Sequence, residues 1–180
     1  MPIKAKSLPS FEVLKEHFSY DPETGIVCRL IANKHRPNSI GPCGSPLRDG
    51  SLYVKFNGRS LKVHRIAWKL QTGKEPPVRI DHINGNAADN RWENLRAATH
   101  QGNMANCRRP GKYLPGVKPI GRRWYAQASS RTDKQSLGGF DTEAEAHAAY
   151  VEWHLSYYGE FSVYARAKPS ASASLGLRSA

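Results

Sequence analysis

The stretch Asp81-His82-Ile83-Asn84-Gly85-Asn86 decides the fold, because it joins the end of an expected strand to a loop rich in Asn and Asp. The strand is expected over residues 78–83. A second short strand is expected over 94–98, and Thr99 can cap the helix that follows. The pattern therefore predicts a strand, a loop, a second strand and a helix in close succession.

The residue types in this segment suit metal-assisted hydrolysis of a phosphodiester. Neighbouring side chains on a strand point to opposite faces, so Asp81 can hold a metal while His82 faces a water molecule. An ion such as Mg²⁺ prefers oxygen ligands and keeps several waters, so one carboxylate and one amide oxygen suffice. Asn103, one turn into the expected helix, can supply the amide oxygen, and Asn94 can tie the loop closed.

Composition indicates an acidic partner. The 180 residues include 27 Lys and Arg against 15 Asp and Glu, which gives a formal charge of +12. A polyanion such as nucleic acid fits that excess. The sequence shows no apolar run of membrane-spanning length and no signal-peptide pattern, so a cytoplasmic, non-secreted protein without membrane contact is expected. Cys28, Cys43 and Cys107 form no Cys-x-x-Cys pair and are expected to be reduced thiols.

The residues before the central stretch alternate between strand and helix patterns. Two alternating runs flank Asn57-Gly58, which is a strong signal for a hairpin with a type I′ turn. The other expected elements are a helix over 11–18 with Ser10 as its N-cap, a strand over 26–30, an irregular segment over 32–50, and a helix over 64–72 that ends at Gly73.

A second module is expected after the basic breaker Arg108-Arg109-Pro110-Gly111-Lys112. Three short strands are expected, over 116–119, 123–129 and 135–140. Thr142 and Glu145 have capping-box spacing and open a long helix that Gly159 closes. One face of this helix is expected to pack on the sheet. It carries a stripe of Ala146, Tyr150, Trp153 and Tyr157.

The first half of the chain resembles the HNH endonuclease family with the ββα-metal fold, and most closely the phage and intron homing endonucleases. The resemblance spans roughly residues 11–108 and rests on Val63-His64-Arg65, the stretch 81–86, Asp89-Asn90, Asn94-Leu95-Arg96 and Asn103. It implies that Asp81 and Asn103 bind the metal, that His82 is the general base, and that Asn94 orients the loop and, through it, the histidine.

Position 103 carries Asn where the toxin nucleases of that family carry His, which matches the homing nickases. One divalent metal is therefore expected, with Mg²⁺ first and Mn²⁺ as the alternative, rather than zinc or nickel. His100 lies one turn earlier and is the rival ligand to Asn103.

The second module resembles the DNA-binding domain of the plant Apetala-two and ethylene-response factors. The residues that carry the resemblance are Gly116-Val117, Arg123-Trp124-Tyr125-Ala126, the run Leu137–Ala146 and Ala149-Tyr150. It implies a three-stranded antiparallel sheet packed on one helix, with the sheet reading double-stranded DNA. Alternation along the strand puts Trp124 on the face of Ala126, so Trp124 is either core or contact.

Candidate DNA contacts come from both modules: Arg65, Arg96, Lys112, Arg122, Arg123, Trp124, Gln127, Arg131 and Lys134. The expected fold class is α+β, with an HNH nuclease domain at 1–109, an Apetala-two-like domain at 110–165 and a disordered tail at 166–180. The expected function is a metal-dependent, homing-type DNA endonuclease that acts as a monomer on DNA. The alternatives are a non-catalytic DNA-binding regulator and a nuclease that acts on RNA or without sequence preference. Target sequence, nick versus double-strand break, and biological role stay open.

Overall fold

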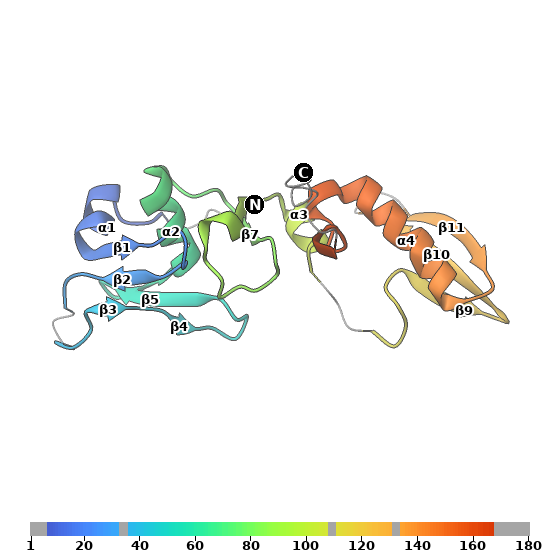
Figure 1. Cartoon of the computed structure of the whole chain (residues 1–180), viewed down its shortest axis with the longest axis horizontal. Coiled ribbons are helices and arrows are strands. Elements are labelled where there is room, and N and C mark those ends of the chain that lie inside the picture. Colours follow the sequence, from blue (N-terminus) through green and yellow to red (C-terminus); the bar gives the residue numbers. More distant parts are fainter. Residues whose placement is uncertain (1–6, 33–35, 108–110, 131–133, 168–180) are drawn as a thin grey trace, which may run out of the picture. The chain divides into compact units, whose positions relative to one another are not determined.

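The computed structural model describes residues 7–32, 36–107, 111–130 and 134–167. The chain divides into two compact units between Asn103 and Met104 (Figure 1). Both units combine helices with small antiparallel sheets, which confirms the α+β class. The expected boundary at 109/110 and nearly all of the expected tail lie outside the described residues. None of the helices in the described ranges has the length and apolar content needed to cross a membrane.

The first unit begins with helix α1 (Phe11–His17), whose first turn is capped as expected, since Ser10 Oγ accepts a hydrogen bond from the amide of Val13. The chain then turns into strand β1 (Phe18–Tyr20), which pairs antiparallel with β2 (Val27–Arg29). The turn that joins the two strands ends at Gly25, whose φ of 74° is a conformation that favours glycine.

The expected hairpin around Asn57-Gly58 is present as strands β5 (Leu52–Phe56) and β6 (Arg59–Lys62). Both turn residues have positive φ, 47° and 72°, as a type I′ turn requires. The segment expected to be irregular contains two strands of two residues each. Strand β3 (Gly41–Pro42) pairs with β2, and β4 (Ser45–Pro46) pairs with β5.

Helix α2 (Val63–Thr72) starts one residue earlier than expected and ends at Gly73, where the backbone is left-handed. Helices α1 and α2 pack against each other and against strands of this unit (Figure 1). Leu14 of α1 and Ile66 of α2 are fully buried in the core, together with Phe18. Burial of an aliphatic side chain of this size contributes about 1.5–3 kcal/mol, so these contacts fix the frame that carries the site.

The central stretch forms strand β7 (Ile80–His82), which pairs antiparallel with β8 (Leu95–Ala97). The 3₁₀ helix η1 (Trp92–Asn94) leads into β8, and helix α3 (His100–Ala105) follows it. Thr99 caps α3 as expected, because its Oγ1 accepts a hydrogen bond from the amide of Gly102 at 3.0 Å. The predicted order of strand, loop, strand and helix is therefore confirmed.

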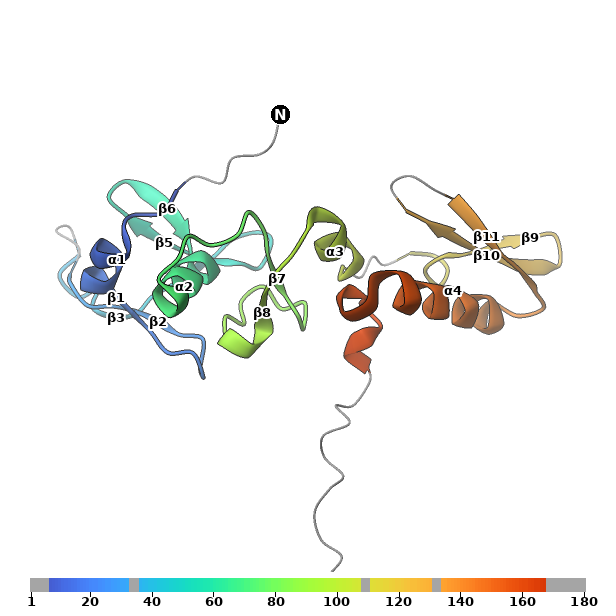
Figure 2. The same ribbon diagram turned by 90° about the horizontal axis from the view of Figure 1, so that it is seen from above.

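The second unit is a three-stranded antiparallel sheet with a helix on one face (Figure 2). Strand β10 (Arg123–Ser129) lies between β9 (Val117–Ile120) and β11 (Lys134–Phe140). Helix α4 (Glu143–Tyr158) carries the expected capping box. It is followed by the short 3₁₀ helices η2 (Gly159–Phe161) and η3 (Ala165–Ala167).

Small residues allow α4 to approach the sheet closely, since Ala126, Ala128 and Ala146 are all fully buried. The expected stripe along α4 is buried only in part, because the side chain of Tyr157 is 48% exposed. Tyr157 instead stacks on Trp153, with ring centroids 5.1 Å apart. The buried residue on that turn is His154, whose Nδ1 lies 2.7 Å from Ser162 Oγ.

Gly116 provides a test of the second unit. A Cβ at Gly116 would overlap the ring of Tyr150, and its φ is 78°. We expect Gly116→Ala to lower the free energy of unfolding by about 2–4 kcal/mol, through overpacking as well as backbone strain. Gly121→Ala is the matched control, because its φ is 62° but nothing lies within 4 Å of an added Cβ. It should cost only about 1 kcal/mol. Urea unfolding with hydrogen exchange of peptides 111–167 measures both; equal costs would contradict this packing.

Candidate active site

Asp81 and Arg96 lie opposite each other on β7 and β8 and form an ion pair across the two strands. Arg96 donates a hydrogen bond from Nε to Asp81 Oδ2 at 2.9 Å, and its Nη2 lies 2.8 Å from the same oxygen as part of the ion pair. Both side chains are largely buried. Two charge-assisted contacts in a buried setting hold the carboxylate on β7 in one orientation.

His82 is the next residue on β7 and is buried beneath the loop that connects the two strands. Its Nε2 lies 3.2 Å from Asn90 Oδ1. The amide of Asn90 has a defined orientation, because its Nδ2 donates to the carbonyl oxygen of Ala88 at 3.0 Å. An amide oxygen can only accept, so the hydrogen must come from Nε2 of His82. In the neutral ring the lone pair then lies on Nδ1, which is the atom able to take a proton.

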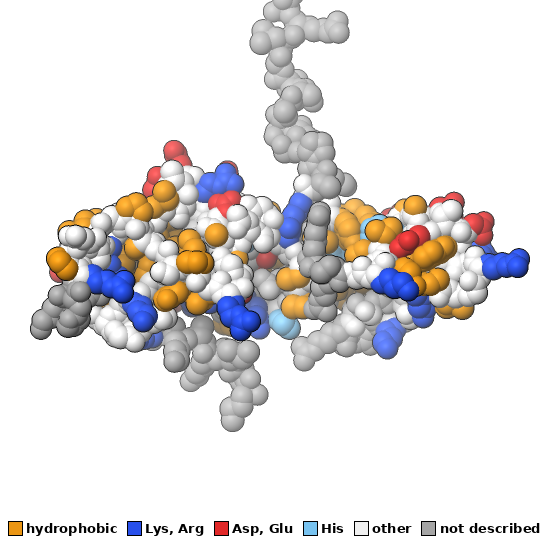
Figure 3. Space-filling model, turned by 90° about the horizontal axis from the view of Figure 1, so that it is seen from below, with side chains coloured by type: hydrophobic (Ala, Val, Ile, Leu, Met, Phe, Trp, Pro, Cys, Tyr) orange, Lys and Arg blue, Asp and Glu red, His pale blue; other side chains and the backbone are white. Residues whose placement is uncertain are grey.

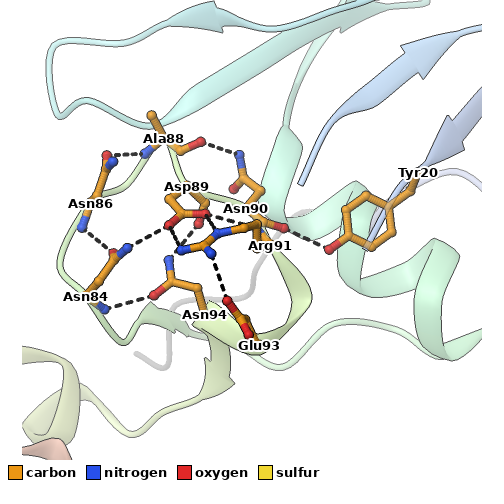
Figure 4. Close-up of polar contacts among 9 residues, drawn as sticks. All are labelled: Tyr20, Asn84, Asn86, Ala88, Asp89, Asn90, Arg91, Glu93 and Asn94. Atoms are coloured by element: carbon orange, nitrogen blue, oxygen red, sulfur yellow. Dashed lines mark hydrogen bonds and ion pairs between the residues drawn. The ribbon is translucent and has the colours of Figure 1, made fainter. Parts of the chain in front are cut away.

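The loop over residues 83–94 is held by its own Asn and Asp side chains (Figure 4). Asn94, the last residue of the loop, is bonded to its beginning and its middle: Oδ1 accepts from the amide of Asn84 at 2.9 Å, and Nδ2 donates to the carbonyl oxygen of Asp89 at 2.7 Å. Asn84 Nδ2 also donates to Asp89 Oδ2. The position expected to tie the loop therefore does so by direct hydrogen bonds.

Asp89 is the acidic centre of that loop. It accepts hydrogen bonds from Arg91 through both carboxylate oxygens, at 2.9 and 3.0 Å, and these bonds lower the pKa of Asp89 to about 2. Arg91 reaches Glu93 as well, at 2.8 Å (Figure 4). Asp89 is thus engaged in fixing the loop rather than directed at an open surface.

Burial governs the electrostatics of the two histidines. The rings of His64 and His82 meet edge to face, with centroids 5.3 Å apart. Burial lowers the pKa of His64 to about 3, and the nearby His82 and Lys62 act in the same direction. Burial also lowers the pKa of His82, against the opposing effects of the Asn90 hydrogen bond and of Asp81. Both rings are therefore uncharged at neutral pH.

The donor chemistry at this place fits a hard divalent cation. Within the parts of the chain that the structure describes, no three His, Cys, Asp or Glu side chains gather as a metal cluster. A cation held by one carboxylate and one amide oxygen would keep several waters, as Mg²⁺ commonly does. Asp81 offers a carboxylate on β7. Asn103 is half-buried on α3, and the exposed His100 begins that helix.

The predicted DNA contacts of the first unit have protein partners. Arg65 is half-buried and donates to the carbonyl oxygens of Pro77 and Pro76, at 2.8 and 3.4 Å. Arg96 is paired with Asp81. These two residues support the frame around the site in this structure, and a phosphate contact by either stays a prediction.

Most predicted contacts of the second unit are exposed: Lys112, Arg122, Arg123, Gln127 and Lys134. Arg123 is tethered to Gly139 O at 3.1 Å and to Asp141 at 3.4 Å. Trp124 is half-buried on the face of Ala126 and meets Tyr113 edge to face. That position favours the core alternative for Trp124. Arg131 lies outside the described residues.

The sequence predicted no individual role for two residues near the site. Asn90 contacts His82 directly, although the orienting role was expected of Asn94 alone. Lys62 lies close enough to lower the pKa of both histidines, and it is paired with Asp49 at 3.2 Å. The pair Asp89-Asn90 was a possible signal, because amide side chains brace irregular loops, but spacing does not reveal which amide meets the ring.

Comparison with known proteins agrees with this geometry. Residues 61–105, a quarter of the chain, match the family model described as HNH endonuclease. The matched segment contains Asp81, His82, Asn94 and Asn103. No curated protein and no solved structure matches the chain.

The resemblance to an HNH nuclease is therefore confirmed for the segment that holds the candidate site. Such nucleases generally use a divalent metal and act on DNA. By its residues 61–105 the chain carries an HNH endonuclease domain, and it is a nuclease, an enzyme that hydrolyses phosphodiester bonds.

Proposed function

We propose that this protein is a homing-type, site-preferring DNA endonuclease that hydrolyses a phosphodiester with a water activated by His82 and with one divalent ion. The observation that carries the proposal is the buried, neutral His82, held through Nε2 beside the ion-paired carboxylate of Asp81. A purely DNA-binding domain has no need for a buried imidazole with a fixed proton next to a carboxylate.

The chain's own residues divide the work. His82 Nδ1 accepts a proton from the attacking water, and Nε2–H stays bonded to Asn90. Asn94 closes the loop that carries this arrangement. Asp81 and Asn103 are the proposed ligands of a divalent ion, for which Mg²⁺ is the first candidate. When bound, that ion supplies positive charge that stabilises the reacting phosphate and the leaving 3′ oxygen.

The second unit is proposed to bind double-stranded DNA with its sheet. On β10, Gln127 is exposed while its neighbours Ala126 and Ala128 are buried, so the strand presents polar side chains on the face away from α4. On the face shown in Figure 3, the second unit carries Lys and Arg side chains at several separate places. Basic side chains on such a surface suit contacts to phosphates. We propose that one monomer bound in this way cuts one strand.

Cleavage of supercoiled plasmid, or of genomic DNA from the source, tests the nuclease proposal. We expect Mg²⁺-dependent nicking that EDTA abolishes. His82→Ala should lower the rate on the order of 10²-fold or more, the usual contribution of a general base. Asp81→Asn should abolish Mg²⁺-dependent cleavage, since the amide lacks the charge that holds the ion.

Asn103→Ala and His100→Ala form a matched pair that identifies the second ligand. Asn103→Ala should cost activity and raise the Mg²⁺ concentration required, whereas His100→Ala should leave both nearly unchanged. Binding of DNA without any cleavage would favour the non-catalytic regulator. Stronger competition by structured RNA than by DNA would favour the RNA nuclease.

The pH dependence of cleavage tests His82 as the base. A general base acts in its neutral form, which predominates above its pKa. Because burial lowers the pKa of His82, the neutral form persists to lower pH than usual. We expect single-turnover rates to rise with pH, with a midpoint below the ordinary histidine value of about 6.5, and to level off near neutrality. The residual rate of His82→Ala should lack this rise. A midpoint above 7 would contradict the assignment.

The salt dependence of DNA binding tests the second unit. If about six phosphates are neutralised, affinity should fall on the order of 10³-fold between about 50 and 200 mM salt. Lys134→Gln should reduce the slope of log affinity against log salt by about 1. Lys74→Gln, an exposed lysine of the first unit, is the matched control and should leave the slope unchanged. Fluorescence anisotropy with labelled duplex measures all three; an affinity independent of salt would exclude the proposal.

A further inference from the structure

Asn90 is the most completely buried polar side chain of the catalytic loop, with 2% of its surface exposed. Three of its polar atoms have partners from three different segments. Oδ1 faces His82 Nε2 at 3.2 Å, and Nδ2 donates to Ala88 O at 3.0 Å. Its carbonyl oxygen accepts from the hydroxyl of Tyr20 at 2.8 Å, as Figure 4 shows. The contacts therefore hold the side-chain amide of Asn90 at both its oxygen and its nitrogen, and hold its backbone at the carbonyl.

The amide of Asn90 can satisfy its neighbours in one orientation. A half-turn of the amide would set Nδ2 against an Nε2–H donor and Oδ1 against the carbonyl oxygen of Ala88. That arrangement would lose one buried and one part-buried hydrogen bond, and each buried polar atom left without a partner costs about 1–3 kcal/mol. The orientation of Asn90 therefore selects the His82 tautomer that carries its hydrogen on Nε2.

The turn between β1 and β2 holds Asn90 from outside the family-matched segment. Burial raises the pKa of Tyr20 to about 12, so its hydroxyl keeps its proton and remains a donor. The amide of Trp92 donates to Pro22 O at 2.9 Å. Gly25 packs so closely that an added Cβ would overlap the amide nitrogen of Arg91 and lie 2.6 Å from the carbonyl carbon of Asn90.

We propose that Asn90 is a positioning residue for the general base: it holds His82 in the Nε2–H tautomer, and the β1–β2 turn, through Tyr20 and Gly25, holds Asn90. This rests on the proposed role of His82. In the reaction, water gives a proton to Nδ1 while its oxygen bonds to phosphorus and the bond to the 3′ oxygen breaks. The proton on Nδ1 later returns to solvent, the leaving oxygen takes one up from solvent, and Nε2–H never leaves Asn90.

The tautomer can be read without substrate. Long-range ¹⁵N–¹H correlation of the His82 ring, recorded at about pH 8, where an ordinary histidine is neutral, distinguishes Nε2–H from Nδ1–H. In the full chain we expect Nε2–H alone. Asn90→Leu removes the acceptor at similar volume and should give a mixture of tautomers. Asn90→Asp keeps an acceptor oxygen and should preserve Nε2–H.

Cleavage and binding separate positioning from folding. Asn90→Leu should lower the single-turnover rate by about 10- to 100-fold, which is no more than loss of the base itself, and leave DNA affinity unchanged. Asn90→Asp should recover part of that loss. Tyr20→Phe, which removes one hydroxyl, should cost only a few-fold in rate.

Gly25→Ala and Gly73→Ala test the turn as a matched pair. Their φ values, 74° and 70°, impose the same backbone strain, but nothing lies within 4 Å of a Cβ added at Gly73. We expect Gly25→Ala to reduce cleavage at least tenfold more than Gly73→Ala, with loss of the single His82 tautomer. Equal effects of the two changes would overturn the role of the turn.

An Nδ1–H tautomer in the unaltered protein would overturn the proposal, as would full activity and an unchanged tautomer in Asn90→Leu. If Asn90→Leu does not fold, Asn90→Asp decides: Nε2–H with cleavage supports the role, and Nδ1–H at the original rate refutes it. A protein that shows the Nε2–H tautomer but cuts no nucleic acid would refute the nuclease proposal while leaving the Asn90–His82 contact established.

Discussion

An irregular loop needs partners for the polar groups of its own backbone, and the loop over residues 83–94 supplies several of them with short amide side chains. Asn84 and Asn86 each accept a hydrogen bond from the backbone amide two residues later, in the manner of Asx turns. Asn94 instead bonds to backbone groups five and ten residues earlier. Apolar packing supplies no hydrogen bonds, and the loop has no strand ladder to provide them. Hydrogen bonds from its side chains therefore define the shape of the loop, and the position of His82 depends on that shape.

An amide at position 90 differs in its consequences from a carboxylate. A carboxylate beside the imidazole would favour the charged ring and raise the pKa of His82. The Asn90 hydrogen bond also raises the pKa of His82, but the amide carries no net charge, and the lowering effect of burial is larger. The ring is thus oriented without being protonated, which a base working near neutrality requires. The ring of His64 packs against the ring of His82, and it is uncharged as well because burial lowers its pKa.

The sequence predicted those features that depend on neighbours along the chain. The hairpin at Asn57-Gly58, the cap at Thr99 and the capping box at Thr142 each follow from local backbone chemistry, and all three are present. The sequence did not predict contacts that depend on strand register or on distant segments. The ion pair of Asp81 with Arg96 requires the register of β7 on β8, and Arg96 had been assigned to DNA. Several of the expected roles, Asn103 as ligand among them, remain predictions.

The contact between Tyr20 and Asn90 shows why the site extends beyond its motif. The two residues are 70 positions apart, and Tyr20 lies well outside the segment that matches the family model. A motif records residues that touch the reaction, whereas the geometry of a catalytic loop is set by whatever packs behind it. Here the packing element is a turn whose glycine leaves no room for a side chain against the loop backbone. Without the β1–β2 hairpin the carbonyl of Asn90 would lose its donor and the amide of Trp92 its acceptor, so we expect the smallest working form of this nuclease domain to include that hairpin.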